Sequence, residues 1–422
     1  MQRLASSLAH QLPRSATRQL PAGVRINLLV QRHYAEDSGP RALRQTKLYD
    51  LHRLQGGKMV PFGGFDMPLF YKTTGGQVVE HKHVRAHAGL FDVSHMVQSK
   101  LVGKGATEFL MRLTPTSIDA LAFTDTLYSS SLSVLLNHDG GILDDLLITR
   151  QGEDEYYIVT NAGRREQDLH WIREQLAEFN SANTYNIRFD VLEKQGLVAL
   201  QGPKAMRILQ QFTDFDLTTL HFGKATFANV DGVRCHIARG GYTGEDGFEI
   251  SIPPKETTSL SKKILSHQDV MLIGLAARDS LRLEAGMCLY GHDLNETINP
   301  VEASLAWIVS KARRTPESAT FIGAQRVLQV LREGPAKRRV GFVCQSAVPR
   351  EGAPIFTEDG SEQIGVITSG IPSPTANKNV SMGYIKSGYH KQGTAVQVAV
   401  RRQNRDAVVA KLPFVEPKYY RG

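Results

Sequence analysis

Two adjacent aspartates, Asp144 and Asp145, interrupt the otherwise apolar segment GGILDDLLITR (140–150). The segment reads as a strand, and neighbouring strand side chains point to opposite faces, so the two carboxylates cannot act as a pair. We expect one to point with the apolar side chains into whatever the strand covers, and the other to face solvent or a turn. The inward carboxylate must meet a hydrogen-bond donor from the protein or from a ligand, because its burial is otherwise costly. Two interpretations stay open: a hairpin cap after the glycines, or a functional acid beside a ligand cavity.

Histidines are concentrated in the segment HKHVRAHAGLFDVSHM (81–96). His83 and His87 are four residues apart, which places two imidazoles on one helix face, as in zinc sites. No glutamate follows as in HExxH, and the interleaved lysine and arginine would repel a cation. We therefore expect a basic surface helix and no metal.

Two further stretches could hold a ligand. The glycine-rich GGYTGEDGFEI (240–250) places Tyr242 in a loop and Glu249 on the following strand, which suits a tight hairpin or a ligand contact. Arg278 and Arg282 are four residues apart on a predicted helix and share one face. Arginine suits carboxylate binding, and a surface ion pair is the alternative.

Several function classes lack their motifs. No GxxxxGK[ST] occurs and no GxGxxG follows a strand, so nucleotide and flavin domains have no support, and no GxSxG is present. The three widely spaced cysteines predict inert thiols in a reducing compartment. We assign Trp171 and Trp307 to the core. The short basic runs at 311–314 and 337–339 predict solvated surface and no nucleic-acid partner.

Alternating strands and helices must position these residues. Strands are predicted at 141–149, 155–163, 196–203, 232–239 and 247–253, and helices at 164–179, 203–212 and 272–286. This mixture indicates α+β lobes. After a linker near 332–335, short strands between Gly and Pro turns predict a small antiparallel barrel, at 338–344, 363–370, 380–385, 394–400 and 407–414.

The N-terminal segment has its own composition. Residues 1–35 hold five arginines and no acid, so of the net charge of +8 only +3 remains beyond them, from 45 basic against 42 acidic residues. Such a leader is typical of a mitochondrial targeting peptide, here 1–34 with cleavage after Tyr34, and predicts the mitochondrial matrix; a tail without an address is the alternative. No run of about 18 apolar residues occurs, so no membrane-spanning helix is expected.

Taken in order, nine stretches resemble the aminomethyltransferase family of the glycine cleavage system, the T-proteins. They are FDVSHM (91–96), GGILDDL (140–146), TNAG (160–163), VALQGP (198–203), GYTGEDGFEI (241–250), LAARDSLRLEAGMCLYG (275–291), NPVEASLAW (299–307), ITSG (367–370) and PFVEPKYY (413–420). The resemblance covers about 46–420. It implies a multi-lobed α+β folate-binding region (46–330) and a C-terminal antiparallel β-barrel domain (336–422).

The resemblance also implies an activity. Members of the family take an aminomethyl group from the lipoyl arm of the H-protein, release ammonia and pass the methylene to tetrahydrofolate, giving 5,10-methylenetetrahydrofolate. The expected partner is therefore the lipoylated H-protein, and the expected co-substrate is tetrahydrofolate, without metal or flavin. The basic residues Lys311, Arg313 and Arg314 could meet an acidic carrier.

Family positions carry over onto individual residues. Asp145 matches the functional carboxylate near the folate nitrogens, as a base or as an electrostatic stabiliser. Glu249 matches the acid that binds the pterin edge, and Arg278 matches the arginine of the folate site, suited to the negative folate tail. The remaining matches close or line the same cavity: Tyr419, Tyr242, Met96, Leu132, Val159 and Asn161. At position 132 this chain has a leucine, whereas some members of the family carry a tyrosine there.

Three rival interpretations fit the sequence less well. The folate domains of dimethylglycine or sarcosine dehydrogenases follow a large FAD domain, for which this chain has neither room nor motif. Related iron–sulfur assembly or tRNA factors carry K-G-C-Y-x-G-Q-E, whereas residues 284–293 read EAGMCLYGHD. An interaction-only role is opposed by the intact Asp145, Glu249 and Arg278.

Overall fold

The computed structural model describes residues 42–422, so the predicted targeting segment 1–34 lies outside the described residues. Within the described part, no helix is long and apolar enough to cross a bilayer. The helices are α2 (Tyr49–Leu54), α3 (Gln77–Ala86), α4 (Ala106–Leu113), α5 (Arg165–Asn183), α6 (Ala205–Leu209), α7 (Thr257–Leu265), α8 (Leu275–Glu284) and α9 (Ala324–Glu333).

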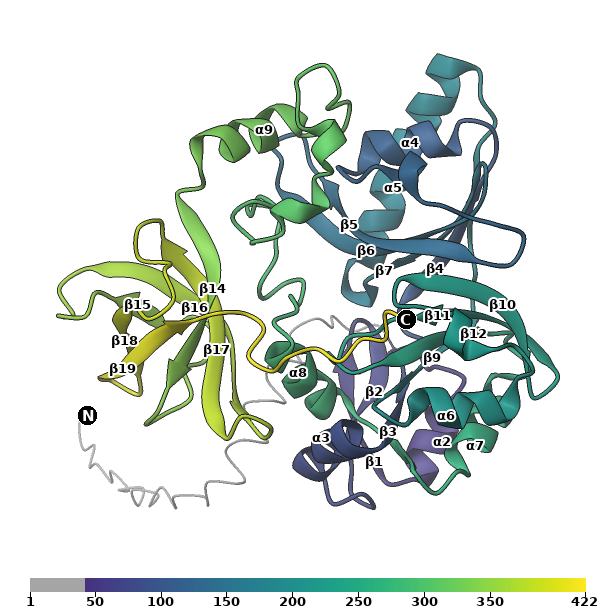
Figure 1. Ribbon diagram of the computed structural model, residues 1–422, viewed down its shortest axis with the longest axis horizontal. Coiled ribbons are helices and arrows are strands. Elements are labelled where there is room, and N and C mark those ends of the chain that lie inside the picture. Colours follow the sequence, from purple (N-terminus) through teal and green to yellow (C-terminus); the bar gives the residue numbers. More distant parts are fainter. Residues whose placement is uncertain (1–41) are drawn as a thin grey trace, which may run out of the picture.

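Two lobes share one mixed sheet of eleven strands, in the order β13-β3-β9-β12-β11-β10-β5-β6-β7-β4-β8 (Figure 1). Its strands are β3 (Ala88–Asp92), β4 (Val97–Val102), β5 (Tyr128–Leu136), β6 (Ile142–Gly152), β7 (Glu155–Thr160), β8 (Arg188–Val191), β9 (Gly196–Gln201), β10 (Lys224–Val230), β11 (Val233–Arg239), β12 (Gly247–Ile252) and β13 (Val270–Leu272). A separate hairpin joins β1 (Gly57–Phe62) to β2 (Phe65–Tyr71).

The large sheet curls until its two halves face each other. Ser251 on β12 donates a hydrogen bond of 2.6 Å to the Gln98 side chain on β4, although five strands separate β12 from β4 in the sheet order. The rings of Tyr157 and His236 also meet across this interior, at 4.6 Å between centroids. Strand alternation therefore gives the sheet an inner face, which includes these four side chains, and an outer face.

Helices cover the outer face. Helices α4 and α5 pack on β4–β7 through an apolar cluster that includes Leu146 and Ile148, while α6 and α7 pack on β9–β12. Helix α8 instead packs on the inner face, where Ala277 and Leu281 meet Phe91 and other inner side chains. It ends before Gly286, whose φ of +69° is the left-handed conformation expected just past a helix end.

The C-terminal part is a closed six-stranded barrel, in the order β14-β17-β16-β15-β18-β19. Its strands are β14 (Lys337–Cys344), β15 (Pro354–Phe356), β16 (Gln363–Ser373), β17 (Lys378–Lys386), β18 (Ala395–Val400) and β19 (Gln403–Ala410). The predicted α+β fold with an antiparallel barrel is confirmed. The sequence did not predict β15, which has three residues, and the last strand ends at Ala410 instead of 414.

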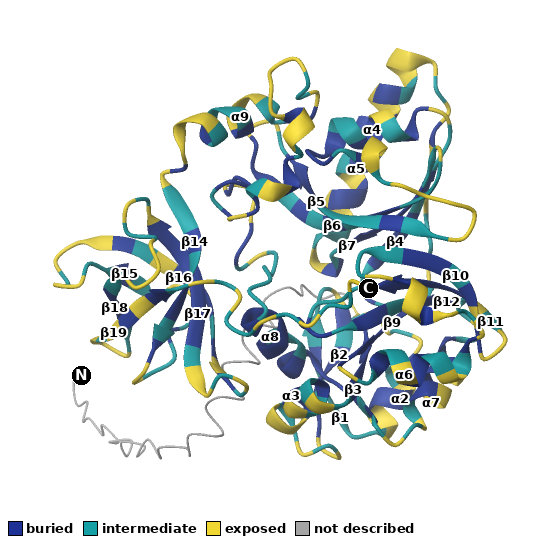
Figure 2. Cartoon of the chain, viewed as in Figure 1, coloured by how far each residue is buried: buried dark blue, intermediate teal, exposed yellow. Residues whose placement is uncertain are grey.

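Buried charges join the barrel to α8, which lies between the barrel and the sheet (Figure 2). The Arg282 guanidinium, 2% exposed, donates to Asp293 at 2.6 Å and to Ser369 of the barrel at 2.9 Å. The Glu284 carboxylate accepts from the Ser373 hydroxyl and from the Thr375 backbone N–H. The alternative interpretation of Arg282, a surface ion pair, is therefore wrong. The buried Arg282 side chain instead fixes α8 to the barrel.

Candidate functional site

The register of β5, β6 and β7 places several predicted residues on the inner face. Leu147 lies opposite Leu132 on β5 and opposite Val159 on β7, so these three side chains share one face. Asp145 precedes Leu147 by two residues along the strand. Its side chain therefore points to the same face of the sheet. Asn161 follows directly after β7.

Asp145 meets its hydrogen-bond donor inside the protein. The Asn161 side-chain N–H group donates 2.9 Å to Asp145 Oδ1, and 2.9 Å to Oδ1 of Asp144. Asp144 is fully buried under α5, so the expectation that it faces solvent or a turn is wrong. The hairpin-cap interpretation is also wrong, because Asn137 caps that turn through the Gly141 N–H at 2.8 Å.

The surroundings of Asp145 favour a proton near neutral pH. Burial, and then the negative charge of Asp144, raise the pKa of the Asp145 carboxyl to about 7, against a smaller lowering by the Asn161 hydrogen bond. A carboxyl with a pKa near the working pH can accept and release protons during a reaction.

Glu249, Arg278 and Tyr242 come together from three elements. Glu249 lies on β12 in the inner row that includes Ala199 of β9 and Ala238 of β11. Burial raises the pKa of its carboxyl, and the nearby Arg278 charge opposes this. The Arg278 guanidinium carbon lies 4.6 Å from the Tyr242 ring centroid. No hydrogen bond from another of the described residues reaches the Glu249 carboxylate.

The C-terminal tail crosses from the barrel to the β11–β12 loop (Figure 1). The Lys418 backbone N–H donates 2.8 Å to the carbonyl of Gly244, in the loop that also carries Tyr242. The Tyr419 ring stacks on Phe222 with 4.2 Å between centroids and 20° between planes. The tail thus holds Tyr419 beside the loop that bears a predicted site residue.

His95, next to the predicted Met96, belongs to the histidine-rich segment 81–96, whose motif gave it no role of its own. It is 2% exposed, its Nδ1 has no hydrogen-bond partner among the described residues, and the Phe62 ring lies edge-on at 5.3 Å. Burial, and then the charge of Arg278, lower the pKa of its imidazole to about 4. His95 is therefore a neutral polar group close to Arg278.

The other histidines of this segment are structural. His81 is buried and bonds the Ser280 hydroxyl at 2.7 Å, whereas the surface-helix interpretation placed it outside. His83 stacks on His87 with 4.8 Å between rings, and His87 pairs with Asp269 at 3.0 Å. Over residues 42–422, no three His, Cys, Asp or Glu side chains gather as a metal would need.

Two predictions about exposure are wrong. Arg313 is 2% exposed, and its guanidinium donates to the carbonyls of Thr114 at 2.6 Å and Thr116 at 3.0 Å, so it cannot meet a partner protein. Trp307 was assigned to the core but is 61% exposed. Their positions depend on the turn at 306–313, whose two short 3₁₀ helices the sequence pattern did not predict.

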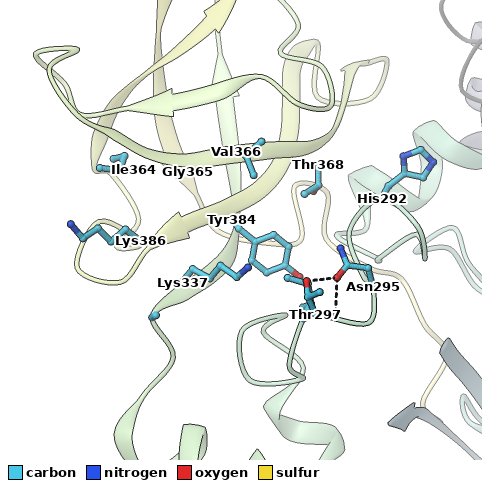
Figure 3. A pocket seen from close by; sticks show the side chains of 12 residues that line it. His292, Asn295, Thr297, Lys337, Ile364, Gly365, Val366, Thr368, Tyr384 and Lys386 are labelled. Carbon is cyan, nitrogen blue, oxygen red and sulfur yellow. Dashed lines mark hydrogen bonds between the residues drawn. The ribbon is translucent and has the colours of Figure 1, made fainter. Parts of the chain in front are cut away.

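A hollow of about 420 Å³ lies elsewhere, between barrel strands β16 and β17 and the segment 292–298 (Figure 3). Its walls include Lys337 and Tyr384, with the Lys337 ammonium 5.4 Å from the Tyr384 ring centroid. None of the predicted site residues lines it. The candidate site is therefore the inner face of the curled sheet with α8 and the tail.

Comparisons with known proteins agree with this architecture. Residues 48–313 match the GCVT N-terminal domain, and residues 337–416 match the glycine cleavage T-protein C-terminal barrel domain. The chain is 42% identical over 397 residues to the probable mitochondrial aminomethyltransferase of Schizosaccharomyces pombe, covering 93% of this chain and 98% of that protein. It is 45% identical over 394 residues to the mitochondrial aminomethyltransferase of Saccharomyces cerevisiae, covering 90% and 96%.

A solved structure leads to the same family. The glycine cleavage system aminomethyltransferase T of Bartonella henselae superposes with a TM-score of 0.82 at 39% identity, covering 90% of this chain and all of that one. The resemblance noted in the sequence is confirmed, and so is the grouping with mitochondrial members. The chain belongs to the aminomethyltransferase family of the glycine cleavage system.

Proposed function

We propose that the chain transfers the methylene of an aminomethyl group from the lipoyl arm of the H-protein to tetrahydrofolate, on the inner face of the curled sheet. The observation that supports this proposal is that Asp145, Glu249, Arg278 and Tyr242 face one interior, from β6, β12, α8 and the β11–β12 loop. Glu249 offers acceptor oxygens, which no hydrogen-bond donor among residues 42–422 occupies, to the N–H groups of a pterin edge. Arg278 offers a cation to the carboxylates of a folate tail.

We assign the proton transfer to Asp145. As a folate nitrogen forms its bond to the methylene carbon, the carbon–nitrogen bond to the leaving ammonia breaks, and Asp145 accepts the proton of the attacking nitrogen. A second folate nitrogen then displaces the dihydrolipoyl sulfur. The two folate nitrogens each lose one proton. The released ammonia takes up one of these protons, and the released dihydrolipoyl thiol takes up the other.

The remaining predicted residues shape the same interior. Met96 and Val159 contribute to the apolar cluster beneath α8, and Leu132 lies in the same inner row as Val159, on the other side of Leu147. Tyr419 is carried by the tail, next to the loop of Tyr242. We propose that these side chains exclude water from the reacting groups, which strengthens the electrostatic effect of Asp145.

The substrate assignment is tested by ammonia release from aminomethyl-loaded H-protein, with and without tetrahydrofolate. We expect rapid release only with tetrahydrofolate. Glu249→Gln should raise the KM for tetrahydrofolate about tenfold or more, because a charge-assisted hydrogen bond worth about 1.5–3 kcal/mol is weakened. Glu358→Gln, on an exposed barrel turn, is the matched control. An unchanged KM in Glu249→Gln would remove Glu249 from the folate site.

A further inference from the structure

A second carboxyl cluster lies directly behind Asp145, on the outer face of β6. Asp144 accepts hydrogen bonds at both oxygens, from the Asn161 backbone N–H at 2.9 Å and from the Asn161 side chain at 2.9 Å. Asp168, in the first turn of α5, is 1% exposed and lies against Asp144, close enough for a hydrogen bond between the two carboxyls once one of them carries a proton. Neither Asp168 oxygen has a donor among the other described residues.

The two carboxyls cannot both be ionised in a buried contact, so one of them holds a proton. The hydrogen-bond pattern assigns it to Asp168. Asp144 already accepts from two N–H groups, which stabilise its anion, whereas Asp168 has no donor among residues 42–422 to stabilise a charge. Burial and the Asp144 charge accordingly raise the pKa of Asp168 to about 11. Protonated Asp168 then donates to Asp144.

The cations and phenols around Asp168 do not change this assignment. The positive charge of Arg164 lowers the pKa of Asp168, but by less than burial and Asp144 raise it. The Arg164 guanidinium is paired with Glu296 at 2.7 Å and lies 5.1 Å from the Tyr290 ring centroid. The Tyr290 hydroxyl donates to the carbonyl of Ile142.

One amide joins this pair to the inner face. The Asn161 side-chain N–H group bonds Asp144 Oδ1 and Asp145 Oδ1 at the same distance of 2.9 Å. We propose that protonated Asp168 keeps Asp144 anionic, and that Asp144, acting through its charge and through Asn161, positions Asp145 and makes it a stronger base. This inference rests on the proposed function, in which Asp145 accepts a proton. Asp144 and Asp168 are thus positioning residues.

Asp144 is the group whose charge distinguishes the variants, because Cys288 and Tyr242, which also interact with Asp145, stay neutral near pH 7. Burial raises the pKa of the Cys288 thiol to about 12 and raises that of the Tyr242 phenol well above its ordinary value. Neither group ionises between pH 5 and 9. A change in the basicity of Asp145 in an Asp144 variant therefore reports the loss of the Asp144 charge.

The test is the pH profile of kcat for folate-dependent ammonia release. Asp144→Asn should move the acid limb to lower pH by about one unit, because a like charge next to Asp145 is removed. Asp168→Ala should move it in the same direction, because Asp144 then takes up the proton itself. Asp168→Asn still offers an N–H donor to Asp144 and should leave the limb in place. Glu166→Gln, exposed on the same helix, is the matched control.

Each outcome bears on the inference. An acid limb that stays in place in both Asp144→Asn and Asp168→Ala would overturn it. Collapse of turnover in folded Asp168→Asn would also overturn it. The amide donates a hydrogen bond as the protonated carboxyl does but cannot transfer a proton, so Asp168 would then be a group that gives up its proton during turnover. Tetrahydrofolate affinity, measured by calorimetry on each variant, separates misfolding from altered chemistry. Full turnover in Asp145→Asn would instead overturn the proposed function, a result distinct from either of these.

Discussion

At the scale of single residues, the site depends on which carboxylates face which interior. Alternation along 140–150 predicts that Asp144 and Asp145 point to opposite faces, and the register of β6 agrees. The burial of Asp144 could not be predicted, because its partner Asp168 is more than twenty positions away on a helix. A local pattern gives the direction of a side chain, but not what packs against it.

The proton affinity of Asp145 leads to a pH prediction. The carboxylate is the form that accepts a proton, so kcat should rise with pH through the pKa of about 7 and level off above it. The measurement is kcat for ammonia release from pH 5.5 to 8.5, with H-protein and tetrahydrofolate saturating. A flat profile over this range would mean that Asp145 does not titrate during turnover.

At the scale of elements, apolar spacing and turn residues predicted part of the strands and helices, whereas β5, β10 and the short β15 were not predicted. The strands at β6, β7, β9, β11 and β12 and the helices α5 and α8 lie where their apolar spacing and bounding turns placed them. Strand β15 is too short to show a period, and its place follows from barrel closure. The barrel was therefore predictable as a class, but its strand number was not.

The start of β6 gives a prediction about packing. A Cβ at Gly141 would lie 1.7 Å from the carbonyl oxygen of Glu296, so the 292–298 segment or the strand must move. Gly141→Ala should lower the free energy of unfolding by about 2 kcal/mol, as overpacking does. Urea denaturation measures this. Gly240→Ala, where a Cβ meets nothing within 4 Å, is the control, and equal stabilities of the two variants would contradict the account.

At the scale of the whole molecule, the curled sheet, α8 and the tail bring distant residues together. Glu249, Arg278 and Tyr242 come from three regions of the chain, and no spacing in the sequence predicts that they lie together. Their assignment came from the family resemblance, which supplied the tertiary information that periodicity lacks. The docking surface shows the limit of such reasoning, because Arg313 in the basic run is buried.

The predicted docking surface for the H-protein is now restricted to the exposed basic residues of the segment 311–314. Lys311 and Arg314 are exposed, and Trp307 beside them offers an aromatic anchor. Lys311→Glu with Arg314→Glu should lower the association rate with the H-protein about tenfold at low salt and weaken its salt dependence, since surface charge mainly steers encounter. Stopped-flow association measures both. Lys262→Glu with Lys391→Glu is the control, and equal rates in the two double variants would exclude this surface.

The central claim is that Asp145 performs chemistry on folate instead of only binding it. The most direct measurement pairs single-turnover ammonia release with calorimetric tetrahydrofolate binding in Asp145→Asn. The amide keeps the shape and the contact with Asn161 but cannot accept the proton. We predict that kcat falls about 100-fold or more while the dissociation constant for tetrahydrofolate changes little. Turnover at the wild-type rate with intact folate binding would contradict the account.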